Sequence, residues 1–142
     1  MILLDANLLI YAVNRDAPLH RPAKAWLEKT LSEGEIVGLC WPVLLAFIRL
    51  TTRPGLFRQP LPLEAALDLV AKWLAWPSVQ VVEPTGRHLH VLRGLLTSLG
   101  TGGNLVSDAH LAALAIEHGA LLCSTDGDFA RFGGLRWLNP LA

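Results

Sequence analysis

The sequence has little cysteine, little charge and no long uninterrupted apolar run, and each scarcity excludes a class of protein. Its two cysteines, Cys40 and Cys123, lack the neighbours of a redox motif or a metal knuckle, which excludes a disulfide framework and a cysteine-held metal. Both lie in apolar segments, as buried thiols of the reducing cytosol do. No run reaches the roughly 18 apolar residues of a membrane span. The apolar N-terminus lacks a basic region and contains Asp5, unlike a signal peptide. We therefore expect a cytoplasmic protein without a membrane segment.

Charged residues make up only 17% of the chain, and the formal net charge is zero. The field of the whole molecule therefore cannot attract nucleic acid, and any such contact must come from a local basic patch. The length of 142 residues and the apolar fraction of 52% predict one globular domain over residues 1–142. Weak self-repulsion and five tryptophans favour a homodimer. The predicted self-association surface is the helical region around Trp26, Trp41, Phe47 and Leu50.

Short apolar segments alternate with segments of helical periodicity along the whole chain. Strands are expected at residues 2–4, 36–39, 79–82, 121–123 and 135–138. Helices are expected at residues 7–11, 18–33, 42–53, 62–76, 88–99 and 107–118. Strands that are separated by helices usually pair in parallel, since the helix provides the crossover. The sequence therefore predicts an α/β fold with a central four- to five-stranded parallel sheet and helices on both faces.

Three aspartates are expected at the edge where parallel sheets hold their ligands. Asp5 follows the first predicted strand, Asp126 follows the fourth, and Asp108 lies in the first turn of the helix that precedes the fourth. If the first and fourth strands are neighbours, these carboxylates converge and raise each other's pKa unless a cation neutralises them. Oxygen ligands favour Mg²⁺ or Mn²⁺, which can activate water and neutralise charge on a phosphodiester. We predict all three aspartates as metal ligands and catalytic residues.

Each of these acidic positions also has a structural interpretation. Asp108 can complement a helix dipole, and Asp126 belongs to a turn-forming segment. Asp128 is interpreted as the N-cap of the short turn that follows it, and as a supporting residue of the site. Asn7 and Thr125 lie beside the aspartates, where they can orient carboxylates or water, or bond to turn backbone.

Arginines provide the local positive charge that a phosphate backbone would require. Arg49 and Arg53 lie along the third predicted helix, and three more arginines follow in the sequence at positions 58, 131 and 136. A basic cluster can be a solvated face or can hold nucleic-acid phosphates. Arg49 and Arg53 are our candidates for the second role.

The three acidic motifs together resemble a known family. They are Leu-Leu-Asp-Ala-Asn-Leu-Leu-Ile-Tyr-Ala at 3–12, Ser-Asp-Ala-His-Leu-Ala-Ala-Leu-Ala at 107–115 and Ser-Thr-Asp-Gly-Asp-Phe at 124–129. In type and order they resemble the motifs of PIN-domain nucleases, most closely VapC toxins of toxin–antitoxin operons, over essentially the whole chain. The resemblance implies Mg²⁺-dependent endoribonuclease activity and a homodimer. It also implies inhibition by a cognate VapB-like antitoxin whose C-terminal segment occupies the groove.

The sequence departs from that family at one position. Family members usually carry a glutamate on the helix after the second strand, where this chain has Ala46. The loss should weaken the metal site or limit it to one ion. Glu117 lies too far along its own helix to be an obvious replacement. His110 is two residues beyond Asp108, but a lone histidine is more often a surface or core residue.

Two other interpretations stay open at this point. A catalytically weak or inactive PIN-fold module that binds RNA or a protein is favoured by Ala46. The three retained aspartates oppose it, because a binding module has no need to gather repelling charges. A receiver-like phosphotransfer domain would need a further strand-end aspartate and a nearby lysine. All three lysines lie on predicted helices: Lys24, Lys29 and Lys72.

Overall fold

The computed structural model describes all 142 residues and contains a five-stranded parallel sheet. Its strands are β1 (Ile2–Leu4), β2 (Val37–Leu39), β3 (Val79–Val81), β4 (Leu121–Cys123) and β5 (Trp137–Leu138). The strand order is β3-β2-β1-β4-β5 and every pairing is parallel. In the central strand, Ile2 is paired with Val37 on one side and with Leu121 on the other. The predicted parallel pairing of the strands is confirmed, and β1 and β4 are neighbours in the sheet.

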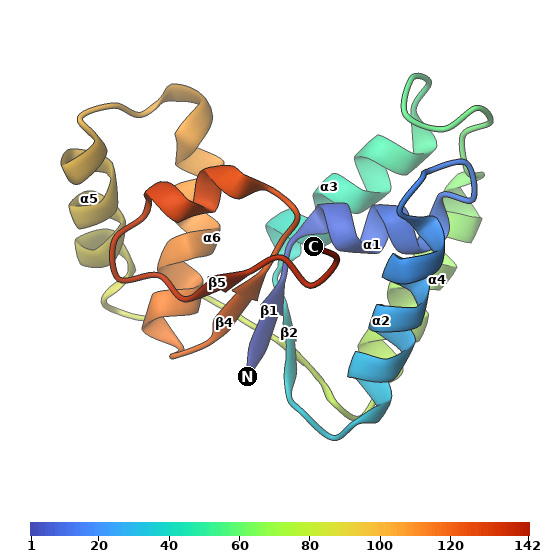
Figure 1. Cartoon of the computed structure of the whole chain (residues 1–142), viewed down its shortest axis with the longest axis horizontal. Helices are drawn as coiled ribbons and strands as arrows, with labels where there is room; N and C mark the ends of the chain where they lie inside the picture. Colours follow the sequence, from blue (N-terminus) through green and yellow to red (C-terminus); the bar gives the residue numbers. More distant parts are fainter.

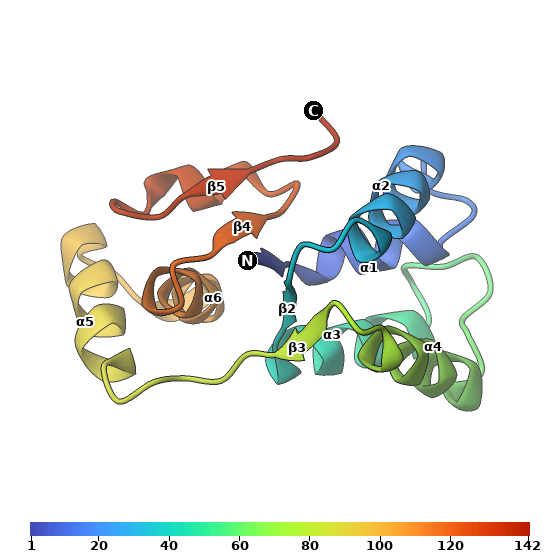
Figure 2. The same cartoon turned by 90° about the horizontal axis from the view of Figure 1, so that it is seen from below.

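Six α-helices cover the two faces of this sheet. They are α1 (Ala6–Val13), α2 (His20–Ser32), α3 (Trp41–Thr52), α4 (Leu63–Ala75), α5 (His88–Leu99) and α6 (Val106–Glu117). Figure 2 shows α5 and α6 on one side of the sheet and α1 to α4 on the other. Figure 1 shows β1 continuing into α1 beside β4, so the edge where these strands end lies between the two groups of helices. The predicted α/β architecture with helices on both faces is confirmed. None of the helices is long and apolar enough to cross a membrane.

Local sequence signals account for most of the helix boundaries. The α5 helix has the predicted bounds and ends at Gly100, whose φ of 69° lies in the left-handed region that closes helices. The α3 helix carries Pro42 in its first turn, where proline removes no helical hydrogen bond. A 3-10 helix, Gly103–Leu105, occupies part of the segment expected to be a loop. The β5 strand is shorter than expected.

The core lies between the central strands and the helices packed on them. Leu3, Leu122 and the small residues Ala109 and Ala112 are fully buried. Alanines on α6 let this helix lie close to the sheet and so place its first turn near the strand ends. Both cysteines are buried and unpaired, as expected.

The predicted self-association surface is wrong for one of its residues. Phe47 is fully buried and packs edge-to-face against Trp73, with ring centroids 4.8 Å apart. It therefore belongs to the packing of α3 against α4. The sequence did not reveal this partner because helical periodicity alone does not distinguish a core face from an interface. Trp41 is exposed, whereas Trp26 and Leu50 are half-buried.

Candidate active site

Asp5 occupies the junction between the central strand and the first helix. It caps the N-terminus of α1, and its Oδ1 accepts a hydrogen bond of 2.8 Å from the backbone N–H of Ala6. Its backbone N–H donates to the carbonyl of Cys123 on β4, at 3.0 Å. A helix therefore begins where the buried strand ends because an aspartate provides the cap. The same geometry directs the second carboxylate oxygen away from the helix, towards the end of β4.

Ser124 links the ends of β1 and β4. Its fully buried hydroxyl donates to Oδ2 of Asp5 at 2.7 Å and accepts from Asn7 Nδ2 and from the backbone N–H of Asp126, each at 3.0 Å. A hydroxyl offers one donor and two acceptor positions, and all three are used here. Asn7 also donates to Oδ2 of Asp5 at 3.3 Å and accepts from the Thr125 N–H at 3.4 Å. These five residues form one network, which we call the Ser124 network.

Ser124 is not among the site residues expected from the sequence. Its only signal was its position, directly after a buried strand and two residues before Asp126. Serine is common in turns, so composition gave no reason to assign it a role. Its function as a hydrogen-bond hub depends on residues 119 and 117 positions away, namely Asp5 and Asn7.

Asp126, rather than Asp128, is the N-cap of the short helix that follows β4. The side chain of Asp126 accepts a 2.9 Å hydrogen bond from the backbone N–H of Asp128, and the 3-10 helix spans Gly127–Arg131. The predicted capping role of Asp128 is therefore wrong, because the helix begins earlier than the sequence suggested. Asp128 is exposed, with Arg131 at 3.9 Å.

Asp108 approaches the same region from the other side of the sheet. It lies in the first turn of α6, and together with Asp5 it lines a small pocket of about 110 Å³. Ala46 of α3 and His110 also line this pocket. The structure therefore places Ala46 next to two of the predicted ligands, as expected for the position where the glutamate is missing.

Burial first, and repulsion between carboxylates second, raise the pKa values of Asp5 and Asp108. Burial raises the pKa of Asp5, and the charge of Asp126 raises it further, whereas hydrogen bonds from Ser124 and Ala6 act in the opposite direction. The pKa of Asp108 is raised to about 6, first by burial and then by the charges of Asp126, Asp5 and Asp128. Ionisation of Asp5 and Asp108 therefore places unfavourable negative charge in the site.

Replacing Asp108 with Asn should stabilise the metal-free protein in a pH-dependent manner. Folding raises the pKa of Asp108 from 3.8 to about 6, so its ionisation destabilises the fold above that range. Below about pH 4 the carboxyl is protonated in both the folded and the unfolded chain, and the effect disappears. In EDTA, the melting temperature of Asp108→Asn should exceed that of the parent at about pH 8, and the difference should shrink towards pH ~4.

The matched control is Asp68→Asn, which changes an exposed aspartate of α4. This variant should melt like the parent at both pH values. A stabilisation by Asp108→Asn that does not depend on pH would contradict the charge argument.

The acidic residues fit a hard divalent cation in their chemistry. No group of three or more His, Cys, Asp or Glu side chains lies close enough to enclose a metal ion. Instead, Asp5 and Asp108 share a pocket, while Asp126 is connected to Asp5 through Ser124. Mg²⁺ is usually held by one or two carboxylates and keeps several waters, so it does not require a closed cage. Carboxylates with raised pKa values would gain from such a cation.

Glu117 and His110 belong to a second polar group, which joins α5 to α6. Glu117 accepts hydrogen bonds from the Thr85 hydroxyl at 2.6 Å and backbone N–H at 3.0 Å, and lies 2.6 Å from His88 Nδ1. His88 Nε2 in turn lies 2.9 Å from His110 Nδ1. Burial acts to raise the pKa of Glu117, but these hydrogen bonds lower it overall. The Glu117 carboxylate thus contacts Thr85 and His88 and does not replace the missing glutamate.

Basic side chains lie on both flanks of α1. Arg49 and Arg53 are exposed on α3 and directly after it. A second group was not predicted: Arg15, Arg21 and Lys24 line a pocket of about 540 Å³ at the start of α2. The sequence did not indicate this group because its members come from a loop and a helix.

Comparisons with known proteins agree on one family. A family model described as PIN domain matches residues 2–135. Ribonuclease VapC37 of Mycobacterium tuberculosis is 54% identical over 142 residues, which is 100% of this chain and 99% of that protein. Ribonuclease VapC33 of the same species is 43% identical over 141 residues, 99% of each chain.

Solved structures share the fold at lower identity. VapBC2 from Rickettsia felis, bound to a DNA fragment from its promoter, aligns with a TM-score of 0.73 and 19% identity, covering 98% of each chain. Mycobacterium tuberculosis VapC20, described as a sarcin-ricin loop cleaving toxin, aligns with a TM-score of 0.69 and 22% identity. That alignment covers 96% of this chain and 99% of VapC20. These similarities are evidence for the fold alone.

Proposed function

The chain belongs to the PIN-domain family, and we propose that it is the endoribonuclease toxin of a VapBC-type toxin–antitoxin pair. The observation that carries this proposal is the Ser124 network, which holds Asp5 at the pocket that Asp108 also lines and joins it to the backbone of Asp126. Full-length relatives named as VapC ribonucleases support the activity. The proposed substrate is RNA, and the proposed protein partner is a cognate VapB-like antitoxin. A cytoplasmic location, a single domain and a homodimer complete the proposal.

PIN-domain ribonucleases generally depend on divalent metal ions, and here we propose Mg²⁺, with Mn²⁺ as a substitute. Asp5, Asp108 and Asp126 would hold the ion together with water, because the three carboxylates do not enclose it by themselves. When bound, it would supply a water of lowered pKa and neutralise charge on the phosphodiester. Ser124 and Asn7 keep Asp5 Oδ2 in one orientation through their hydrogen bonds. In this proposal, Asn7, Thr125 and Asp128 are supporting residues.

RNA binding would depend on local charge, because the net charge of the chain is zero. The α3 helix contains no acidic residue, and exposed Arg49 and Arg53 give it a positive face. Phosphate contacts of this kind supply affinity and are sensitive to salt. We propose that these two arginines hold the backbone of the RNA next to the carboxylates.

Incubation of the purified protein with a structured, end-labelled RNA tests the proposed activity. We expect internal cleavage with Mg²⁺ or Mn²⁺, none in EDTA, and recovery when the ion is returned. The Asp108→Asn protein, purified in the same way, controls for a contaminating ribonuclease. Undiminished cleavage in EDTA would contradict the metal mechanism. If the protein cleaves with neither ion, Ala46 would support a PIN-fold module that binds RNA or a protein without cleaving.

A further inference from the structure

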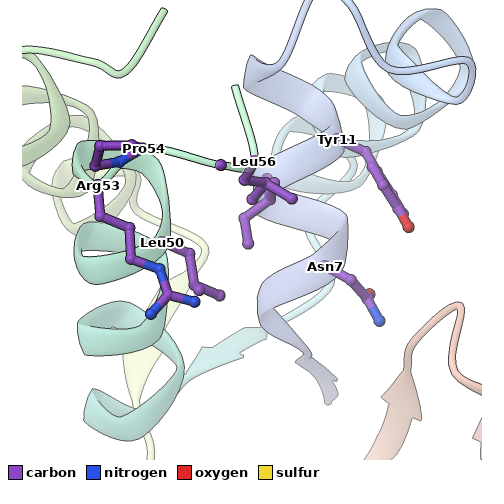
Figure 3. Close-up of a pocket in the computed structure, with 8 residues that line it drawn as sticks. Asn7, Tyr11, Leu50, Arg53, Pro54 and Leu56 are labelled. Carbon is purple, nitrogen blue, oxygen red and sulfur yellow. The ribbon is translucent and has the colours of Figure 1, made fainter. Parts of the chain in front are cut away.

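A pocket with apolar walls lies beside the Ser124 network, and of its lining residues only Asn7 and Arg53 have a role in the proposal above. Its volume is about 520 Å³, and it is formed by α1, the end of α3 and the following loop. Figure 3 shows Leu50 and Arg53 on one side of it and Asn7 and Tyr11 on the other, with Leu56 between them. Pockets of about 300 to 1,000 Å³ with mostly apolar walls and a few polar groups are typical small-molecule sites.

This pocket is continuous with the Ser124 network. Asn7 lines the pocket, and its amide nitrogen contacts both Asp5 Oδ2 at 3.3 Å and Ser124 Oγ at 3.0 Å. If a polymer placed one of its phosphodiesters at the carboxylates, the monomer next to that phosphodiester would therefore reach the pocket. A ligand of the pocket and a substrate of the acidic residues can be parts of one molecule.

Positive charge lies in the pocket at Arg53 and in a separate pocket next to it. Arg53 lines the apolar pocket on the α3 side. Beyond Tyr11 lies the separate pocket of Arg21 and Lys24, which Glu28 also lines. The two pockets meet where the carbonyl of Tyr11 lies 2.9 Å from His20 Nδ1. Apolar walls with an arginine among them fit a ligand that joins a flat apolar face to a negative charge. Nucleotides within an RNA strand have this character.

We propose that the pocket binds one unstacked nucleobase of the RNA strand, next to the phosphodiester at the carboxylates. Leu50, Leu56 and Tyr11 contact the base, and Arg53 contacts a neighbouring phosphate. The group of Arg21 and Lys24 holds the strand as it leaves the site. This inference rests on the proposed function because it takes RNA as the substrate. Apolar side chains would also suit a protein segment, but Arg53 in the pocket and the basic side chains of the neighbouring pocket favour a polyanion.

Fluorescence anisotropy with two labelled single-stranded RNA 12-mers tests the proposal. One 12-mer carries all its bases, and the other has the same ribose-phosphate backbone without bases. Both are measured in EDTA, so that neither is cleaved and phosphate charge contributes equally. Stacking of a base on an aromatic side chain contributes about 1–3 kcal/mol, so with Tyr11 in the pocket the parent should bind the complete RNA ~10-fold more tightly.

The informative variant is Leu56→Ser, because Leu56 is 47% exposed and its replacement leaves the core intact. In this variant the affinity for the complete RNA should exceed the affinity for the base-free RNA by no more than ~3-fold. The affinity for the base-free RNA itself should stay the same. Leu89→Ser, at a 65% exposed leucine of α5, is the matched control and should keep the preference. Arg21→Gln should weaken binding of both RNAs to the same extent, since it removes only a phosphate contact.

The outcomes separate this inference from the proposed function. Equal affinity of the parent for both RNAs, or an unchanged preference in Leu56→Ser, would overturn the base pocket and leave the pocket to a protein segment, even if the protein cleaves RNA. Base-dependent binding that Leu56→Ser removes would support the pocket, even if cleavage fails with both ions.

Discussion

Replacing Asp5 with Asn should reduce the rate of RNA cleavage by ~100-fold or more. Replacement of residues that only support a metal ligand already reduces activity by about 10- to 100-fold. The reason for the larger effect at Asp5 is the double role of this carboxylate. One oxygen caps α1, while the other accepts from Ser124 and Asn7 and lies beside the pocket shared with Asp108. An amide has the size of the carboxylate but lacks its charge, so it would bind a divalent cation poorly. Initial cleavage rates with saturating Mg²⁺ provide the measurement.

The variant should remain folded, although its stability has opposing contributions. Loss of a buried charge with a raised pKa stabilises the fold, whereas the amide nitrogen cannot accept the hydrogen bond from Ser124. Circular dichroism should therefore match the parent. The exposed Asp16→Asn, which lies outside the Ser124 network, controls for substitution of an aspartate as such. Cleavage at the parental rate would limit Asp5 to its capping and network roles.

Replacing Ala46 with Glu should produce two effects of opposite sign. Ala46 lines the pocket with Asp5 and Asp108, so a glutamate there adds a carboxylate to an already repulsive group. In EDTA this extra charge should lower the melting temperature. With Mg²⁺, the extra oxygen ligand should increase the metal affinity by about tenfold, or ~1.4 kcal/mol. The stabilisation by saturating Mg²⁺ should therefore be larger than in the parent.

Ala46→Gln separates charge from size in the same experiment. The glutamine is as long as the glutamate, so steric strain in this small pocket would destabilise both variants equally. In EDTA, Ala46→Glu should have a lower melting temperature than Ala46→Gln. Saturating Mg²⁺ should raise the melting temperature of Ala46→Glu by more. Calorimetric titration with Mg²⁺ gives the affinity independently of RNA cleavage. Equal metal-induced shifts in the parent and both variants would show that position 46 does not face the ion.

The sequence by itself determined most elements of the fold and many of the places where they end. Short apolar runs form buried strands. Aspartate caps the start of a helix and glycine ends a helix, in each case through contacts within a few residues. The strand that ends at Asp5 and the α5 helix that ends at Gly100 were predictable for this reason. The parallel arrangement followed as well, because helical crossovers separate the strands. The acidic motifs were visible as residue types in a particular order.

The partners of those residues were decided only by the tertiary structure. Ser124 became a hub because the pairing of β1 with β4 brings it to Asp5, which is 119 residues away in the chain. Hydrogen bonds between such distant residues depend on strand order and register, which residue patterns do not contain. Phe47 was expected at an interface, but the packing of α4 buries it against Trp73. The apolar pocket beside Asn7 likewise exists only because α1 and the end of α3 meet in space.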